Sequence, residues 1–282
     1  MKLSNIIDSH VHITPPEIKN NMKKYRKKES YFDLLSGSEV NRNVTGEELI
    51  KVMDENRVQK SIVFGFAFKS FDLCKRVNDY TIHMIEKYPE RLIGFAVVNP
   101  RHQQVEKELK RCLDAGLHGV GELFPTGQQF DMTSKDSLDV TCKFCRKHNW
   151  PILIHLNEPV GHYYKGKTDD SIKKGEILTD NFPRINFIYA HLGGGLCFYE
   201  LMPELKKKLK NVYYDTAALP FLYNQKIYDS LKAAGLLDKI LFGTDYPLIP
   251  PGDYLQEIDN TLLTRGDKQK ILTENISKLL KV

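Results

Sequence analysis

Histidines and carboxylates gather where apolar, β-branched runs of the chain end. Six of them lie at or directly after the end of such a run: His10, His12, Glu122, His155, His191 and Asp245. Imidazole and carboxylate groups bind divalent metal ions, and imidazole also exchanges protons near neutral pH. Each residue alone has an ordinary explanation, such as a hydrogen-bonded core histidine or a helix cap. Their shared position indicates a metal-dependent catalytic site.

The spacing of His10 and His12 directs both rings to one place. Side chains two residues apart on a strand point to the same face, so both imidazoles can reach one central ion. We expect His155 and Asp245 to arrive at the same rim from other strands. Three neutral imidazoles and one carboxylate suit Zn²⁺ or a similar divalent ion and leave a coordination position for water.

Eight short apolar runs are predicted to be strands, with helical patterns between them. They are Ile6–Val11, Ser61–Gly65, Leu92–Val98, Gly119–Phe124, Ile152–Leu156, Ile185–His191, Val212–Thr216 and Ile240–Thr244. From the second run onward they begin roughly 30 residues apart, the length of one strand, one helix and two short loops. This pattern predicts an α/β fold, a (β/α)8 TIM barrel that forms one domain over residues 1–282.

The stretch from Ile13 to Lys60 is longer than this spacing allows. It predicts an insertion after the first strand, leaving from the rim where active sites of such barrels lie. We therefore expect it to serve as a lid or as a contact between copies, and a homodimer is one arrangement that it suits.

Composition excludes several classes of protein. The 282 residues are 41% hydrophobic and 27% charged, and no apolar run approaches the ~20 residues that cross a bilayer. The N-terminus lacks the pattern of a secretory signal, and the odd number of five cysteines indicates reduced thiols in the cytoplasm. The net charge of +5 is too even for a nucleic-acid footprint, so the basic segment Lys19–Lys28 is interpreted as solvated surface. The sequence predicts a cytoplasmic protein that binds a small-molecule substrate, with neither a membrane nor a nucleic acid as its partner.

Four segments carry a resemblance to a known family. They are Ile7-Asp8-Ser9-His10-Val11-His12, Ile154-His155, Ala190-His191-Leu192-Gly193-Gly194 and Phe242-Gly243-Thr244-Asp245-Tyr246-Pro247. Through them the chain resembles the amidohydrolase superfamily, in the branch that includes aminocarboxymuconate-semialdehyde decarboxylase. The resemblance implies a metal-dependent TIM barrel with the ligands His10, His12, His155 and Asp245. It also implies that His191 acts as a general base or polarises the substrate.

Glu122 leaves the number of metal ions open. In two-metal members of the superfamily the fourth strand supplies a bridging carboxylate, and Gly121-Glu122-Leu123 resembles the version with glutamate. A second ion would then lie among Glu122, His155 and His191. In the decarboxylase branch one ion suffices, and Glu122 would accept a hydrogen bond from a ligating histidine or from water. We expect one ion, with Zn²⁺ favoured, and keep two as the alternative.

The loop after the fifth run, residues 157–167, is polar, aromatic and basic. Loops at the catalytic rim of a barrel commonly recognise the substrate. Glu158 and His162 lie nearer to the metal site in sequence than the loop lysines, so we expect them to contact the substrate. Lys165 and Lys167 suit a substrate that carries a carboxylate. An ordinary exposed loop stiffened by proline and glycine is the alternative.

Two reactions fit these residues. The first is hydrolysis of a small amide, ester or lactone by a metal-activated water, with Asp245 taking the proton and the ion or His191 polarising the carbonyl. The alternative is non-hydrolytic decarboxylation or hydration of a small unsaturated carboxylic acid at the same site. Both reactions need an open cation and one base, so the ligands alone do not separate them. A metal-stabilised binding protein without turnover is a third hypothesis.

Overall fold

Eight parallel strands form the centre of the molecule, one for each predicted run. The computed structural model describes residues 5–37 and 42–282. The strands are β1 Ile6–His12, β2 Val58–Phe64, β3 Leu92–Gly94, β4 Val120–Leu123, β5 Ile152–Ile154, β6 Phe187–Tyr189, β7 Val212–Asp215 and β8 Ile240–Leu241. Their order is β1-β2-β3 in one sheet and β4-β5-β6-β7-β8 in the other.

Backbone hydrogen bonds join the two sheets at both seams. Beyond β3, the N–H of Ala96 donates to the carbonyl oxygen of Gly119 at 2.9 Å, and Ala96 pairs in parallel with Val120 of β4. At the other seam, the N–H of Ser9 in β1 donates to the carbonyl oxygen of Phe242, just beyond β8, at 2.7 Å. The strands thus follow one another around a ring, as a TIM barrel requires.

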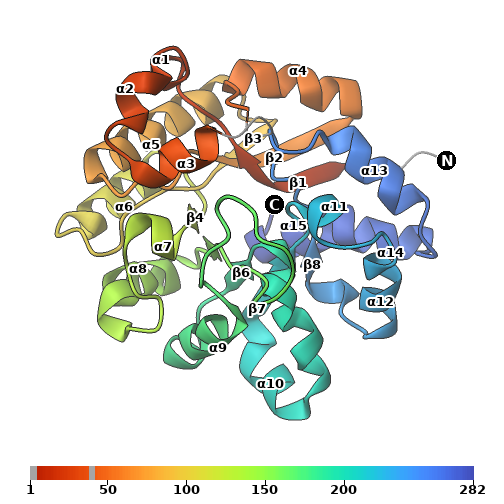
Figure 1. The fold of residues 1–282 in the computed structure, drawn as a ribbon. Helices are drawn as coiled ribbons and strands as arrows, with labels where there is room; N and C mark the ends of the chain where they lie inside the picture. Colours follow the sequence, from red (N-terminus) through yellow and green to blue (C-terminus); the bar gives the residue numbers. More distant parts are fainter. Residues whose placement is uncertain (1–4, 38–41) are drawn as a thin grey trace.

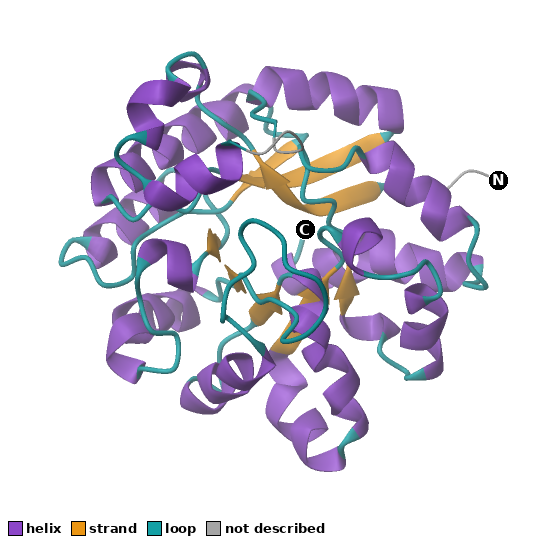
Figure 2. Ribbon diagram, viewed as in Figure 1, coloured by secondary structure: helices purple, strands orange, loops and turns teal. Residues whose placement is uncertain are grey.

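Helices surround the ring on its outer side (Figure 1, Figure 2). The α-helices are α1 Pro16–Lys19, α2 Met22–Arg26, α3 Ser30–Ser36, α4 Gly46–Asn56, α5 Phe71–Lys87, α6 Val105–Asp114, α7 Pro125–Gln128, α8 Lys135–His148, α9 Ile172–Asn181, α10 Pro203–Lys208, α11 Leu219–Leu222, α12 Ile227–Ala233, α13 Pro251–Asp259, α14 Arg265–Gln269 and α15 Asn275–Leu280. The 3-10 and π segments are η1 His191–Leu201, η2 Leu209–Asn211, η3 Leu237–Lys239 and η4 Lys270–Glu274. The alternation of strand and helix is the (β/α)8 order that the sequence predicts.

Alternate side chains of the strands enter two different buried clusters. Ile152 and Ile154 of β5 pack in one cluster with helix residues such as Leu138 of α8. Leu153, between them, packs in the other cluster with Ile188 of β6. Both faces of the strand are therefore dry, which explains why its apolar residues are consecutive. Polar side chains are left to collect at the carboxyl ends of the strands.

The insertion after β1 is shorter than the predicted stretch from Ile13 to Lys60. β2 already begins at Val58, and α4 is the regular helix between the first two strands. The extra chain is therefore α1 to α3 with their loops, and residues 38–41 lie outside the described part. Glu29 anchors this insertion to the barrel, because its carboxylate accepts the backbone N–H of Ser70, beyond β2, at 2.8 Å.

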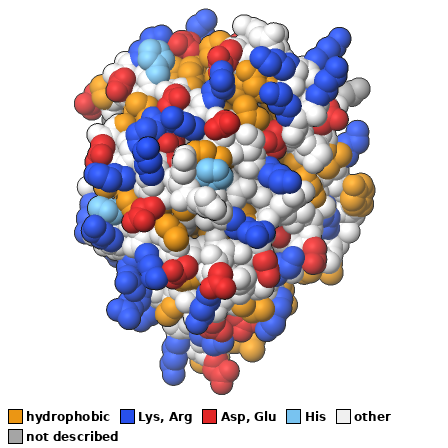
Figure 3. All heavy atoms as spheres, turned by 90° about the vertical axis from the view of Figure 1, so that its left-hand side faces the viewer, with side chains coloured by type: hydrophobic (Ala, Val, Ile, Leu, Met, Phe, Trp, Pro, Cys, Tyr) orange, Lys and Arg blue, Asp and Glu red, His pale blue; other side chains and the backbone are white. Residues whose placement is uncertain are grey.

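Basic and acidic side chains are interspersed on the face shown in Figure 3. Within the basic segment, Lys19 of α1 forms an ion pair with Glu48 of α4 at 2.5 Å. This agrees with the interpretation of Lys19–Lys28 as ordinary surface. Over residues 5–37 and 42–282, no helix has the length and apolar character needed to cross a membrane.

Candidate active site

Irregular backbone places the polar residues at the barrel mouth. The register between β1 and β2 shifts within residues 8–11, which include His10, and that between β4 and β5 shifts within residues 120–123, which include Glu122. Such bulges re-aim side chains and are frequent beside active sites. His191 and Asp245 adopt the left-handed conformation, with φ of 58° and 61°. Non-glycine residues in that conformation carry strain, which recurs at functional sites.

The first group of donor atoms comes from β1, β4 and the loop after β8. Nε2 of His10 and Nε2 of His12 lie 3.3 Å apart, and Oε2 of Glu122 lies 3.8 Å from the former and 3.6 Å from the latter. Oδ1 of Asp245 lies 3.6 Å from His10 Nε2 and 3.3 Å from His12 Nε2. Ligands at about 2.1 Å around a tetrahedral ion lie about 3.4 Å apart. The atoms of His10, His12 and Glu122 therefore have the spacing of a metal-binding set, and Oδ1 of Asp245 lies at a similar spacing from both imidazoles.

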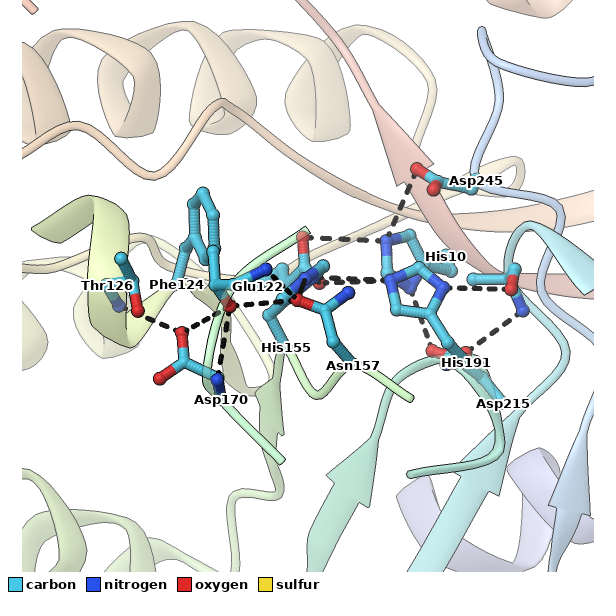
Figure 4. A network of polar contacts seen from close by, with 12 residues as sticks. His10, Glu122, Phe124, Thr126, His155, Asn157, Asp170, His191, Asp215 and Asp245 are labelled. Carbon is cyan, nitrogen blue, oxygen red and sulfur yellow. Dashed lines mark hydrogen bonds and ion pairs between the residues drawn. The ribbon is translucent and has the colours of Figure 1, made fainter. Parts of the chain in front are cut away.

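The second group of donor atoms shares Glu122 with the first (Figure 4). Nδ1 of His155 lies 3.0 Å from Oε1 of Glu122 and 3.2 Å from Nε2 of His191. The two carboxylate oxygens of Glu122 thus face two different groups, as the oxygens of a bridging ligand do. His155 lies with His191 in the second group rather than with His10 and His12 in the first, which is the grouping expected from the sequence in the alternative with a second ion.

Hydrogen bonds on the far side of the rings fix which nitrogen faces each group. Nδ1 of His10 donates to Oδ2 of Asp215 at 2.8 Å, which leaves Nε2 directed at the first group. Nδ1 of His191 donates to the carbonyl oxygen of Ala217 at 2.9 Å, so its Nε2 lone pair faces the second group. Oδ1 of Asp215 also accepts the backbone N–H of His191 at 2.9 Å. One buried carboxylate thereby orients a histidine of each group.

The charges of the site favour an added cation. Burial disfavours the charged form of His10, but the carboxylates of Asp215 and Glu122 outweigh it and raise its pKa to about 10. Burial acts to raise the pKa of Glu122, yet the imidazoles of His10 and His155 hold that pKa well below its usual value. Burial raises the pKa of Asp8, beneath the first group, to about 7. Carboxylates and histidines arranged in this way suit a divalent ion by both charge and donor type.

A cavity of about 810 Å³ opens over both groups. Its floor includes five of the site residues, namely His12, Glu122, His155, His191 and Asp245. Its walls carry four phenylalanines and two cations, namely Phe32, Phe66, Phe124, Phe221, Arg42 and Lys165. The insertion contributes to these walls, and the loop after β5 crosses the barrel mouth (Figure 1). Apolar walls with a few convergent polar groups are typical of small-molecule sites.

Some of the residues expected to recognise substrate line the cavity, and others point elsewhere. His162 and Lys165 line the cavity. Glu158 is not among the described lining residues, and its Oε2 instead lies 3.5 Å from the hydroxyl of Tyr164. Lys167 folds back and donates to the carbonyl oxygen of His162 at 3.2 Å. Of the loop residues singled out from the sequence, His162 and Lys165 are thus placed to meet a ligand.

The family model described as Amidohydrolase matches residues 7–282. The chain belongs to the amidohydrolase family. This confirms the superfamily indicated by the sequence. The chain is an enzyme of the amidohydrolase superfamily with a TIM-barrel fold. Among curated relatives of this amidohydrolase, gamma-resorcylate decarboxylase from Polaromonas sp. is 23% identical over 290 residues, which cover 83% of this chain and 86% of the relative.

Solved structures share the barrel of this amidohydrolase at low sequence identity. The 5-carboxyvanillate decarboxylase from Sphingomonas paucimobilis matches with a TM-score of 0.81 and 12% identity, over 99% of this chain and 100% of that one. The manganese complex of 5-carboxyvanillate decarboxylase from Novosphingobium aromaticivorans matches with a TM-score of 0.79 and 16% identity, over 99% and 96% of the two chains. These matches establish the fold.

Two residues of the amidohydrolase site were missed by the sequence reasoning. Asp215 ends β7 and therefore stands at the same rim as the other carboxylates, which is a signal the sequence does contain. Asn157 was noted as the first residue of the loop after β5, but its contact with His155 gives it a place in the site itself.

Proposed function

We propose that this amidohydrolase decarboxylates a small aromatic or unsaturated carboxylic acid with a bound divalent metal ion. The observation that carries the proposal is the placement of the donor groups on the floor of a cavity walled by phenylalanines and cations. Aromatic walls favour a planar apolar substrate, and the cations favour its carboxylate. The decarboxylases of aromatic acids among the relatives support the same reaction.

The residues proposed to hold the ion are those of the first group, His10, His12, Glu122 and Asp245. Their mixed nitrogen and oxygen donors suit Zn²⁺ or Mn²⁺, and manganese is bound in the Novosphingobium relative. A second ion would take Glu122, His155 and His191. When bound, the metal supplies positive charge that holds the substrate carboxylate or an adjacent oxygen and stabilises negative charge on the substrate.

Two side chains of the protein are proposed to transfer the proton that the reaction requires. The bond between the carboxylate carbon and the neighbouring ring or alkene carbon breaks, CO₂ leaves, and that neighbouring carbon gains one proton. Asp245 is proposed to take up a proton from solvent and pass it to this carbon, because its side chain is 16% exposed and lines the cavity beside His12. His191, whose side chain is 6% exposed on the same floor, is proposed to orient the substrate or to exchange the proton with Asp245.

Hydrolysis is the second candidate, and one observation favours it. The two oxygens of Glu122 face two donor groups, as expected for two ions about 3.5–4 Å apart in a hydrolytic site. In that reaction His191 would serve as a ligand with His155, and Asp245 would accept a proton from the attacking water. The substrate would be a small amide, ester or lactone.

The test follows CO₂ and the isotopes of the product. Metal-loaded protein is incubated in D₂O, and separately in H₂¹⁸O, with a panel of aromatic and unsaturated acids, lactones, esters and amides. Decarboxylation releases CO₂ and leaves one deuterium on the product carbon, and the paired substitution His10→Ala with His12→Ala abolishes it together with bound metal. Incorporation of ¹⁸O without CO₂ release would support hydrolysis and overturn the proposal.

A further inference from the structure

Asn157 lies beside His155 in the site (Figure 4). Its side chain is buried, and Oδ1 lies 3.2 Å from Nε2 of His155, on the opposite side of the ring from the second donor group. Its amide nitrogen Nδ2 donates to the hydroxyl of Tyr164 at 2.8 Å. Tyr164 lines the cavity. One amide therefore touches both a proposed ligand and the wall of the substrate site.

The direction of the hydrogen bond to His155 follows from a neighbouring contact. The atom that faces His155 also lies 2.9 Å from the backbone nitrogen of Thr168. A backbone N–H only donates, so this atom of Asn157 must be the amide oxygen. Nε2 of His155 then has to carry the proton, because an amide oxygen only accepts. Nδ1 consequently faces Oε1 of Glu122 at 3.0 Å and Nε2 of His191 at 3.2 Å, and it is the nitrogen that can bind a metal ion once its own proton is lost.

The backbone around Asn157 is held as firmly as its side chain. Its N–H donates to the carbonyl oxygen of Asp170 at 2.6 Å. The loop after β6 packs directly on it, since a Cβ on Gly194 would lie 2.2 Å from the carbonyl oxygen of Asn157. Gly194 itself has φ of 61°, a conformation in which glycine is favoured. The loops that bear His155 and His191 are thus locked against one another at Asn157.

We propose that Asn157 is a positioning residue that sets the protonated nitrogen and the orientation of His155. By accepting the Nε2 proton it presents Nδ1 to the second donor group. By donating to Tyr164 it fixes the cavity loop relative to that group. The inference rests on the proposed function for a bound divalent ion, and it requires in addition that the second donor group binds such an ion. A purely structural asparagine would hold the loop without affecting the ring of His155.

The experiment measures the imidazole itself as well as metal binding. Apoprotein labelled with ¹⁵N is examined by NMR, with the His155 signals assigned through His155→Gln, and is then titrated with Zn²⁺. We expect Nε2 to carry a proton with and without Zn²⁺, and Nδ1 to lose its proton and shift its resonance on binding, so that the Zn²⁺-bound ring is the Nε2–H tautomer. Asn157→Ala should lose this tautomer preference and bind Zn²⁺ about 10–100-fold more weakly, the usual effect of losing an outer partner of a ligand.

Two further variants separate positioning from loop structure. Asn157→Asp keeps an acceptor oxygen and should bind Zn²⁺ within a few-fold of the unchanged protein. Tyr164→Phe removes the loop contact alone and should leave the tautomer of His155 and the Zn²⁺ affinity unchanged. Loss of affinity in Tyr164→Phe equal to that in Asn157→Ala would assign the effect to the loop and overturn the inference.

The outcomes also distinguish this inference from the proposed function. Failure of the unchanged protein to bind Zn²⁺ removes the metal site and the proposed function with it. Zn²⁺ binding that leaves the His155 resonances unmoved, or that is equally tight in Asn157→Ala, overturns only the role of Asn157. If Asn157→Ala does not fold, the unchanged protein with Zn²⁺ decides, because an Nε2 of His155 that carries no proton, or that itself binds Zn²⁺, contradicts the inference directly.

Discussion

The carboxylate of Asp215 accepts the Nδ1 proton of His10 at 2.8 Å, and both side chains are completely buried. Its other oxygen accepts the backbone N–H groups of His191 at 2.9 Å and of Ala217 at 3.0 Å. Asp215 therefore orients one histidine of each donor group without belonging to either. A carboxylate in this position also makes the imidazole a stronger donor toward a metal.

We predict that Asp215→Asn weakens Zn²⁺ binding about 10–100-fold, because the amide fails to hold His10 in the Nδ1-protonated form as firmly as the carboxylate does. The measurement is a competition titration against a chelator of known affinity. Glu108→Gln is the matched control, since Glu108 is a buried carboxylate on α6 that contacts Asn78 and Arg111 away from the site. Equal affinities for the Asp215 variant and the unchanged protein would contradict the prediction.

Glu122→Gln tests the sharing of one carboxylate between the two groups. If Glu122 bridges two ions, the unchanged protein should hold two Zn²⁺ or Mn²⁺ ions per chain and the variant close to one, because a neutral amide bridges two cations poorly. Metal analysis after removal of loose ions gives the stoichiometry. Glu158→Gln makes the same chemical change beside the site and should retain both ions. One ion in all three proteins would assign Glu122 to orienting the ligands.

His191→Asn separates the two roles considered for this residue. From the sequence, His191 is expected to act on the substrate, so that kcat falls about 10²–10⁴-fold while metal is retained. The structure instead places its Nε2 3.2 Å from Nδ1 of His155, within the second donor group. If that group binds an ion, the variant loses this ion together with activity, whereas the proposed role on the substrate predicts a loss of kcat with metal retained. Metal content and kcat measured on the same sample decide between these outcomes.

The positions of the site residues were predictable because parallel strands end at the same rim of a barrel. Their division into two groups was only the alternative, offered by the resemblance of Gly121-Glu122-Leu123 to the version with a bridging glutamate. It depends on the register shifts around His10 and Glu122, which a pattern of apolar runs does not reveal. It also depends on partners such as Asp215, which is 205 residues from His10 in sequence. Local periodicity carries no information on contacts of that range.

The side-chain directions in the loop after β5 were also not predictable from the sequence. Proximity to the metal site in sequence favoured Glu158 over Lys165 as a substrate contact. In the folded loop Glu158 turns to Tyr164, while Lys165 faces the cavity. An irregular loop has no repeating geometry from which the direction of a side chain follows.

Glu47 gives a stability prediction that depends on pH. Its carboxylate accepts hydrogen bonds from Lys87 at 2.8 Å and Tyr80 at 3.1 Å, and the bond from Lys87 is the main cause that lowers its pKa from 4.5 to about 2. The folded form thus has the lower pKa, so the stabilisation is present above pH 4.5 and is lost as the pH falls toward 2. Solvent screens these half-exposed groups, which limits the contribution to below about 1 kcal/mol.

We expect Glu47→Gln to lower the Tm slightly at pH 7, with a difference from the unchanged protein that shrinks between pH 5 and pH 3. Thermal unfolding at matched ionic strength measures it. A difference that stays constant across this range would show that the loss arises from packing and not from the charge of Glu47.

Lys165 tests whether the cavity attracts anionic substrates. Its ammonium group lines the same cavity as Phe124 and the donor groups, so it lowers the free energy of a bound carboxylate. We predict that Lys165→Gln raises KM about two- to fivefold for a carboxylic-acid substrate, the range of an exposed ion pair, with kcat little changed. Because salt screens such a pair, the effect should diminish at high ionic strength.

Lys173→Gln is the control, since Lys173 on α9 is exposed and pairs with Glu176 at 2.9 Å outside the cavity. An equal rise in KM for both variants would indicate a general field of positive charge, and no rise in either would remove Lys165 from substrate recognition.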